Sequence, residues 1–116
     1  MLGLTWAGEE KRYVKRESRK VLAMYHEVRA QHPALTGIPL YEMIVARLTG
    51  ESAEAAKALV RAAEESFTQW PCERELTFRD VVHYLCFEGF CQSHDNRHWT
   101  HTLLRGVVDS EIPRGL

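Results

Sequence analysis

The spacing of apolar residues is the feature that most restricts what this chain can fold into. Apolar side chains recur at helical intervals of three and four residues in segment after segment of the 116 residues. Strand signals are nearly absent, because the sequence holds no Asn-Gly or Asp-Gly turn and no extended alternation of β-branched and polar residues. We therefore expect an all-α fold, a compact bundle of four or five helices.

The first predicted helix runs from about Gly8 to Gln31. It ends at His32-Pro33, because the residue before a proline avoids the helical region. Its apolar stripe consists of Val14, Ser18, Val21, Tyr25 and Val28. A single stripe of this width predicts a helix that buries one face and leaves the others in water.

The second predicted helix, Pro39 to Leu48, is apolar on most of its sides. Proline suits the first turn of a helix, where its missing N–H costs nothing, and Gly50 is a suitable C-terminal stop. A short helix that is apolar nearly all round is usually buried nearly all round. We therefore expect this segment to form the centre of the core.

Polar residues mark the starts of two further helices. Ser52 can cap a third helix, which Pro71 ends. Thr77 and Asp80 resemble a capping box, with Asp in place of the usual Glu, at the start of a fourth helix. Within that fourth helix, Cys86 shares the apolar face, where a small buried thiol packs like a hydrophobic side chain.

The C-terminal third is harder to divide. Gly89 interrupts the fourth helix, and the chain either turns there or continues with a kink into a fifth helix over about 93–108. Residues 109–116 are expected to be an extended tail. The prediction is a single helical domain over 1–116, with an ordered core of about 8–108.

The charge balance argues against a dedicated nucleic-acid binder. The net formal charge is −1, whereas such a protein needs an excess of Lys and Arg for its phosphate contacts. Charge is unevenly spread: residues 1–32 carry seven basic and four acidic side chains, and residues 42–75 carry seven acidic and four basic ones. This pattern favours charge pairing within the chain or between subunits.

The first helix nevertheless offers a basic face. Its members are Lys11, Arg12, Lys15, Arg16, Arg19 and Lys20. This face could lie against an anion or a nucleic acid, and that remains an alternative to a solvated outer helix surface.

The cysteine content and the ends of the sequence indicate a compartment. Three cysteines cannot form a complete disulfide framework. No run of about 18 apolar residues is present, and the segment 1–8 is too short and too polar downstream for a signal peptide. We therefore expect a cytoplasmic protein with no membrane span and with free thiols.

The densest group of potential metal ligands lies between residues 91 and 101. His94, His98 and His101 are spaced i, i+4 and i+7, which forms a narrow stripe on a helix, and Cys91 precedes them. Sulfur and imidazole nitrogen are the ligands that zinc prefers. The sequence lacks a Cys-x2-Cys pair, so we favour surface and core roles for these residues and no cofactor, with zinc binding as the alternative.

Motifs for catalysis are absent. The sequence contains no Gly-x-Ser-x-Gly, no glycine-rich phosphate loop and no His-Glu-x-x-His. A bundle of this size also leaves little room for a deep cleft. We expect a protein without enzymatic activity.

Aromatic residues outside the main apolar stripes favour a binding role. Phe87, Phe90 and Trp99 cluster around Gly89, and such residues are typical of interface anchors. An alternative is that the fifth helix folds back and covers them. The sequence predicts a small interaction or regulatory protein that binds a protein partner or itself as a homo-oligomer. Metal binding is the first alternative, and nucleic-acid binding through the basic helix is the second.

Overall fold

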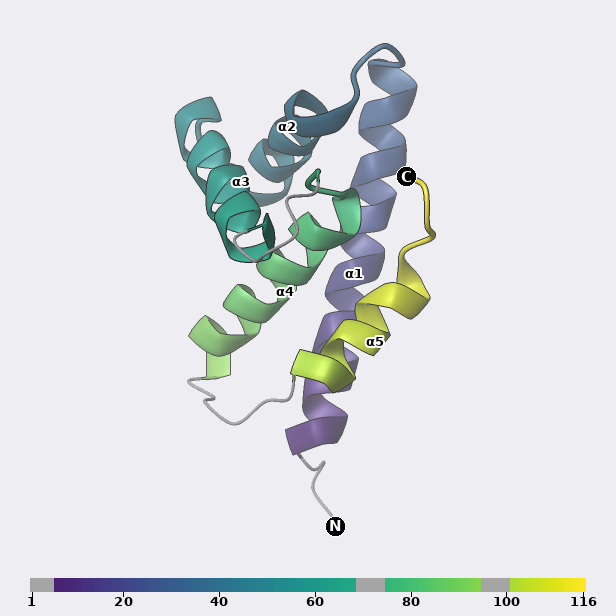
Figure 1. Cartoon of the computed structure of the whole chain (residues 1–116), viewed down its shortest axis with the longest axis vertical. Helices are drawn as coiled ribbons and strands as arrows, with labels where there is room; N and C mark the ends of the chain where they lie inside the picture. Colours follow the sequence, from purple (N-terminus) through teal and green to yellow (C-terminus); the bar gives the residue numbers. More distant parts are fainter. Residues whose placement is uncertain (1–5, 69–74, 95–100) are drawn as a thin grey trace.

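Five α-helices make up the part of the chain that the computed structural model describes, residues 6–68, 75–94 and 101–116 (Figure 1). Side chains are described for residues 8–67, 75–89 and 104–116. The helices are α1 (Trp6–Gln31), α2 (Gly37–Thr49), α3 (Ala53–Thr68), α4 (Phe78–His94) and α5 (His101–Glu111). These ranges contain no strand, so the predicted all-α bundle is confirmed.

The long helix α1 packs as its sequence predicts. All five members of its predicted stripe are buried, and three of them, Val14, Ser18 and Val28, have no exposed surface. Ser18 lies within this stripe, with its Oγ 3.9 Å from the Sγ of Cys86. A 3.6-residue period therefore placed the inward face of α1 correctly.

Helix α4, and not α2, is the centre of the bundle. Among the described residues α4 contacts all four other helices, whereas α2 contacts α1, α3 and α4 only. Of the segment 39–48, Leu40, Tyr41, Ile44 and Val45 are buried and Pro39 is exposed. The expectation of a central second helix is therefore wrong, because α2 packs mainly against α3 and α1, does not contact α5 within the described part of the chain, and leaves Pro39 and Arg47 exposed.

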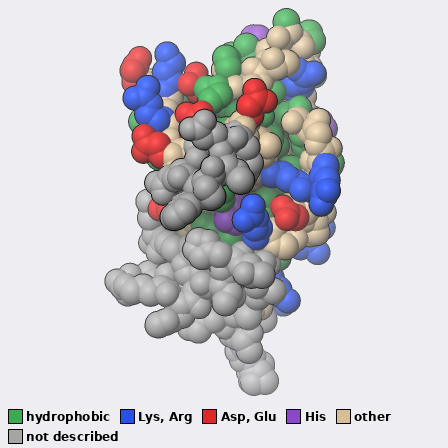
Figure 2. Space-filling view, in the orientation of Figure 1, with side chains coloured by type: hydrophobic (Ala, Val, Ile, Leu, Met, Phe, Trp, Pro, Cys, Tyr) green, Lys and Arg blue, Asp and Glu red, His purple; other side chains and the backbone are tan. Residues whose placement is uncertain are grey.

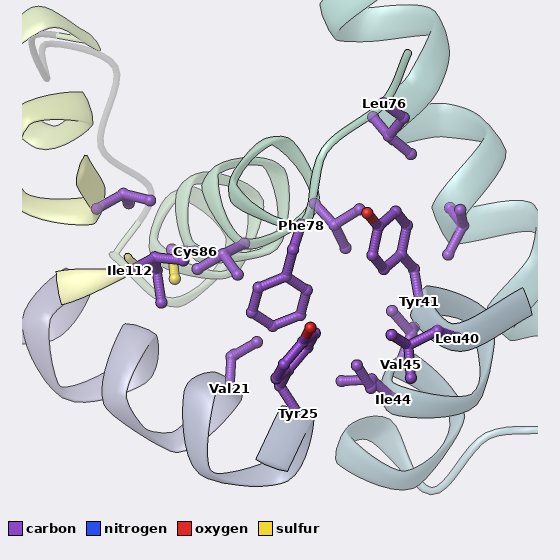
Figure 3. Close-up of a cluster of buried hydrophobic side chains, with 14 of the residues drawn as sticks. Val21, Tyr25, Leu40, Tyr41, Ile44, Val45, Leu76, Phe78, Cys86 and Ile112 are labelled. Carbon is purple, nitrogen blue, oxygen red and sulfur yellow. The ribbon is translucent and has the colours of Figure 1, made fainter. Parts of the chain in front are cut away.

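Aromatic rings join three helices at the middle of the core. The ring of Phe78, at the start of α4, lies 4.6 Å from the ring of Tyr25 and 5.9 Å from that of Tyr41, measured between centroids. Figure 3 shows Phe78 beside Tyr25, with Tyr41 on the opposite side reaching in from α2. This cluster fixes the beginning of α4 against both α1 and α2.

Two predicted helix caps are present. The backbone N–H of Ala55 donates to Ser52 Oγ at 3.2 Å, which caps α3. At α4, the N–H of Thr77 donates to Asp80 Oδ2 at 3.0 Å, and the N–H of Asp80 donates to Thr77 Oγ1 at 3.2 Å. These reciprocal bonds are a capping box, and the prediction from the sequence is confirmed.

Gly89 does not interrupt α4, which continues through it to His94. A Cβ atom at position 89 would lie 2.7 Å from the hydroxyl oxygen of Tyr13 on α1. The absence of a side chain at Gly89 therefore lets the hydroxyl of Tyr13 pack directly against α4. The helix break expected at Gly89 is not present.

The C-terminal segment is anchored to the bundle. Helix α5 runs to Glu111, and Ile112 is fully buried. Arg79 on α4 donates from Nε to the carbonyl of Ile112 at 2.8 Å and from Nη2 to the carbonyl of Asp109 at 2.9 Å. The prediction of an extended tail is thus wrong for residues 109–112. The buried side chain of Ile112 and the hydrogen bonds from Arg79 hold these residues against the bundle.

Candidate anion-binding groove

The six cations of the predicted basic face of α1 fall into two groups, of which the first is already paired. Arg16 Nε lies 3.5 Å from a carboxylate oxygen of Glu17, and Lys20 Nζ lies 3.3 Å from the same carboxylate. Arg19 Nε donates to Glu111 on α5 at 2.7 Å. Each of these three cations thus lies beside a carboxylate, and Arg16 and Lys20 share that of Glu17.

The second group, Lys11, Arg12 and Lys15, is exposed and lies one to two turns nearer the helix N-terminus. Within the described part of the chain, no carboxylate lies within 4.0 Å of the charged nitrogens of these three side chains. Their positive charge is therefore available to a molecule in solution.

These three side chains line one groove between α1 and α5. The groove has a volume of about 580 Å³. Its lining consists of Gly8, Lys11, Arg12, Lys15, Gly106, Val107, Ser110 and Glu111. The spacing i, i+3, i+4 and i+7 places the four α1 residues on one helix face, directed toward α5.

Small residues on α5 keep the groove open. A Cβ atom built on Gly106 would meet nothing within 4 Å, and Ser110, one turn later, turns its hydroxyl back to the carbonyl of Val107 at 2.8 Å. Larger side chains at these two positions would fill the groove. The basic residues were predicted from the sequence, but Gly106 and Ser110 were not. Two small residues spaced i, i+4 lie on one face of a helix, and this spacing is the signal that could have identified them.

The groove carries excess positive charge. It holds three basic side chains and one carboxylate, a net formal charge of +2, and the carboxylate of Glu111 is itself paired with Arg19. Ammonium and guanidinium groups donate hydrogen bonds to carboxylate and phosphate oxygens. Each exposed contact of this kind contributes about 0.2–1 kcal/mol, so binding must come from several together and must weaken with salt.

The aromatic interaction surface expected from the sequence is changed by the position of Phe87. This side chain is only 3% exposed, and its ring centroid lies 3.9 Å from that of His83. The ring therefore belongs to the core, because α4 continues past Gly89 and keeps Phe87 on an inward face. Phe90 and Trp99 lie outside the residues whose side chains the structure describes.

The predicted histidine stripe spans two described helices and the residues between them. His94 is the last residue of α4 and His101 is the first residue of α5, whereas His98 lies outside the described residues. The side chains of these two residues, of Cys91 and of His98 lie outside the described set. Among the side chains that are described, no three potential ligands gather around a point, and zinc binding stays a prediction.

A small polar cavity of about 220 Å³ has His83 in its lining. His83 is buried, with its ring between those of Phe67 and Phe87. Asp80 and Arg79, which also line the cavity, serve the cap of α4 and the attachment of α5. The polar groups here have structural roles, and we do not take this cavity as the functional site.

Cys86 is not suited to nucleophilic chemistry. The pKa of its thiol is raised to about 12, mainly by burial; the hydrogen bond with Ser18 lowers the pKa and the carboxylate of Glu17 adds a smaller upward contribution. A thiol with such a pKa carries almost no thiolate at neutral pH. Its position in the core agrees with the hydrophobic packing role predicted from the sequence.

No helix in the described ranges is long and apolar enough to cross a membrane. The chain was also compared with protein families, curated proteins and solved structures. No family, curated protein or solved structure matches it.

Proposed function

We propose that this chain is a binding protein that recognises an acidic segment of a protein partner in the groove between α1 and α5. The observation that carries the proposal is the placement of Lys11, Arg12 and Lys15. These three cations line one groove and have no carboxylate partner in the described structure. A carboxylate-bearing peptide offers the complementary charge.

The size and charge of the groove favour a peptide over a nucleic acid. A phosphate polymer gains affinity from many cationic contacts along its length, and the chain as a whole carries a net charge of −1. Beyond the groove, Arg16, Arg19 and Lys20 are each next to an acidic side chain. A short acidic segment needs only the local charge that the groove provides.

The proposal keeps the class expected from the sequence, a non-catalytic interaction protein, and changes the surface that does the binding. The aromatic surface was expected to include Phe87, which is buried. The basic face was expected to consist of six cations of the first helix, and the groove selects three of them.

Fluorescence anisotropy with labelled octaglutamate tests the proposal. Two double variants change the net charge of α1 equally: Lys11→Glu with Lys15→Glu inside the groove, and Arg16→Glu with Lys20→Glu outside it. The account predicts that the first pair weakens binding about tenfold or more and the second by less than about threefold. Equal weakening by both pairs would mean that only overall charge matters, and the groove would lose its role.

A labelled single-stranded oligonucleotide of equal charge separates the two classes of anion. We expect it to bind more weakly than octaglutamate at about 150 mM salt. Tighter binding of the oligonucleotide, again lost with Lys11→Glu and Lys15→Glu, would replace the acidic peptide with a nucleic acid. Circular dichroism and unfolding of each variant verify that the fold is retained.

A further inference from the structure

We propose that the acidic partner of the basic groove is a second copy of this chain, which docks through the exposed face of α3 and the adjoining edge of α2. The inference rests on the function proposed above and goes further by naming the occupant. It is carried by a second groove, of opposite charge, elsewhere on the molecule.

The second groove lies between α2 and α3 and has a volume of about 440 Å³. Its charged lining residues are Glu42, Glu54, Lys57, Arg61, Glu64 and Glu65. Four carboxylates and two cations give a net formal charge of −2, equal and opposite to that of the basic groove. The chain therefore carries both halves of a complementary pair.

One molecule cannot bring these two surfaces together. In the described structure α3 contacts α2 and α4 but neither α1 nor α5. Figure 1 shows α3 and α5 on opposite sides of α4, and Figure 2 shows acidic and basic side chains exposed over α3, at the upper left. Complementary charge on opposite sides of one chain is satisfied between copies, in a head-to-tail contact.

The shapes of the two surfaces are compatible with this contact. Helix α3 lies at the edge of the bundle, and its lining of the acidic groove includes Ala58 and Ala62. The basic groove has Gly106 and Ser110 along α5. Small residues on both sides let a helix ridge approach a groove closely, so that flanking carboxylates come within reach of the lysines.

The two cations in the acidic groove also restrict the orientation in which two copies can bind. Lys57 and Arg61 would be repelled by Lys11 and Lys15 in orientations that place like charges together. Orientations that bring Glu54 or Glu65 to the lysines are favoured. Because the two grooves lie on opposite sides of α4, each contact joins the basic groove of one copy to the acidic groove of the next, so the contact is heterologous and builds a ring or an open chain.

Sedimentation velocity with a charge exchange tests the inference. The wild-type chain should associate as its concentration rises, and less so as salt rises. Lys11→Glu with Lys15→Glu, and separately Glu54→Lys with Glu65→Lys, should each weaken self-association about tenfold or more. An equimolar mixture of the two variants should regain association, because each then offers a surface complementary to the other.

The control pair, Arg16→Glu with Lys20→Glu, should associate as the wild type does. Failure of the mixture to associate when both variants are folded would overturn the inference. So would a wild-type chain that remains monomeric at all concentrations. If that monomer still bound octaglutamate through Lys11 and Lys15, the proposed function would stand and the partner would be another acidic protein.

Discussion

Gly89 shows at the scale of one residue why a glycine inside a helical pattern is ambiguous. Glycine lowers helix propensity, so a sequence alone suggests an interruption. In the structure the helix continues, and the residue instead provides space for the hydroxyl of Tyr13 on another helix. The requirement comes from a contact between positions far apart in the chain, which no local pattern records.

A double-mutant cycle measures this requirement. In a Tyr13→Phe background, Gly89→Ala should stabilise the protein by about 0.5–1 kcal/mol, because alanine favours the helix and the ring carbon next nearest to the new Cβ lies 3.8 Å away. In the wild-type background the gain should be smaller or reversed, since the hydroxyl must move. Equal effects in both backgrounds, measured by urea unfolding, would show that the close approach is unimportant.

Cys86 gives a prediction about pH at the same scale. Burial raises the pKa of its thiol from 9.0 to about 12, so the folded state holds the proton more tightly than the unfolded state. The resulting stability is fully present below pH 9 and is lost as pH rises toward 12. Above pH 9 the free energy of unfolding should fall with pH more steeply in the wild type than in Cys86→Ala, by up to about 1.4 kcal/mol per pH unit.

Urea unfolding of both proteins at pH 8, 9 and 10 checks this difference in slope. Burial also raises the pKa of Tyr41. The free energy of unfolding of Cys86→Ala should therefore still decrease at alkaline pH, although less than that of the wild type. Parallel slopes for the two proteins would show that the Cys86 thiol is not responsible.

At the scale of the element, the parts predicted best are those whose causes lie within a few residues. The caps at Ser52 and Thr77 need only a side chain and a backbone N–H three positions away, and both form. The inward stripe of α1 follows from the helical period alone. Helix starts and faces were thus accessible from sequence.

The contribution of Thr77 to the capping box of α4 can be measured against Thr36, a threonine that makes no such cap. Thr77→Ala should cost about 1 kcal/mol of stability, because it leaves the N–H of Asp80 without its hydroxyl partner. Thr36, at the N-cap of α2, makes no side-chain cap hydrogen bond, so Thr36→Ala should change stability little. Similar losses from both substitutions in urea unfolding would contradict the assignment of the cap.

The packing of the helices against one another was harder to predict from the sequence, and the wrong predictions have a common cause. Helix α2 is more uniformly apolar than α4, yet α4 takes the centre because its buried residues point in several directions. One of them, His83, is polar and would be assigned to the surface from its type alone, but Phe67 and Phe87 enclose it. Which helix covers which face depends on packing between elements, and apolar content does not decide it.

At the scale of the whole molecule, the three-dimensional structure is needed to tell which charged side chains are paired and which line the grooves. The sequence identified a basic N-terminal segment, an acidic middle segment and the six cations that form the basic face of α1. It could not tell that Arg19 pairs with Glu111, or that Lys11, Arg12 and Lys15 border α5. Both facts need the contact between the first and last helices, which lie far apart in the chain.

The most direct test of the basic groove is to locate bound acidic peptide on the molecule by nuclear magnetic resonance. Isotopically labelled protein carrying Glu54→Gln and Glu65→Gln, which remove two carboxylates from the acidic groove without adding positive charge there, is titrated with octaglutamate. The account predicts that the amide signals that shift most belong to residues 8–15 of α1 and 106–111 of α5. Shifts concentrated on α3, or spread evenly over all exposed lysines and arginines, would contradict it.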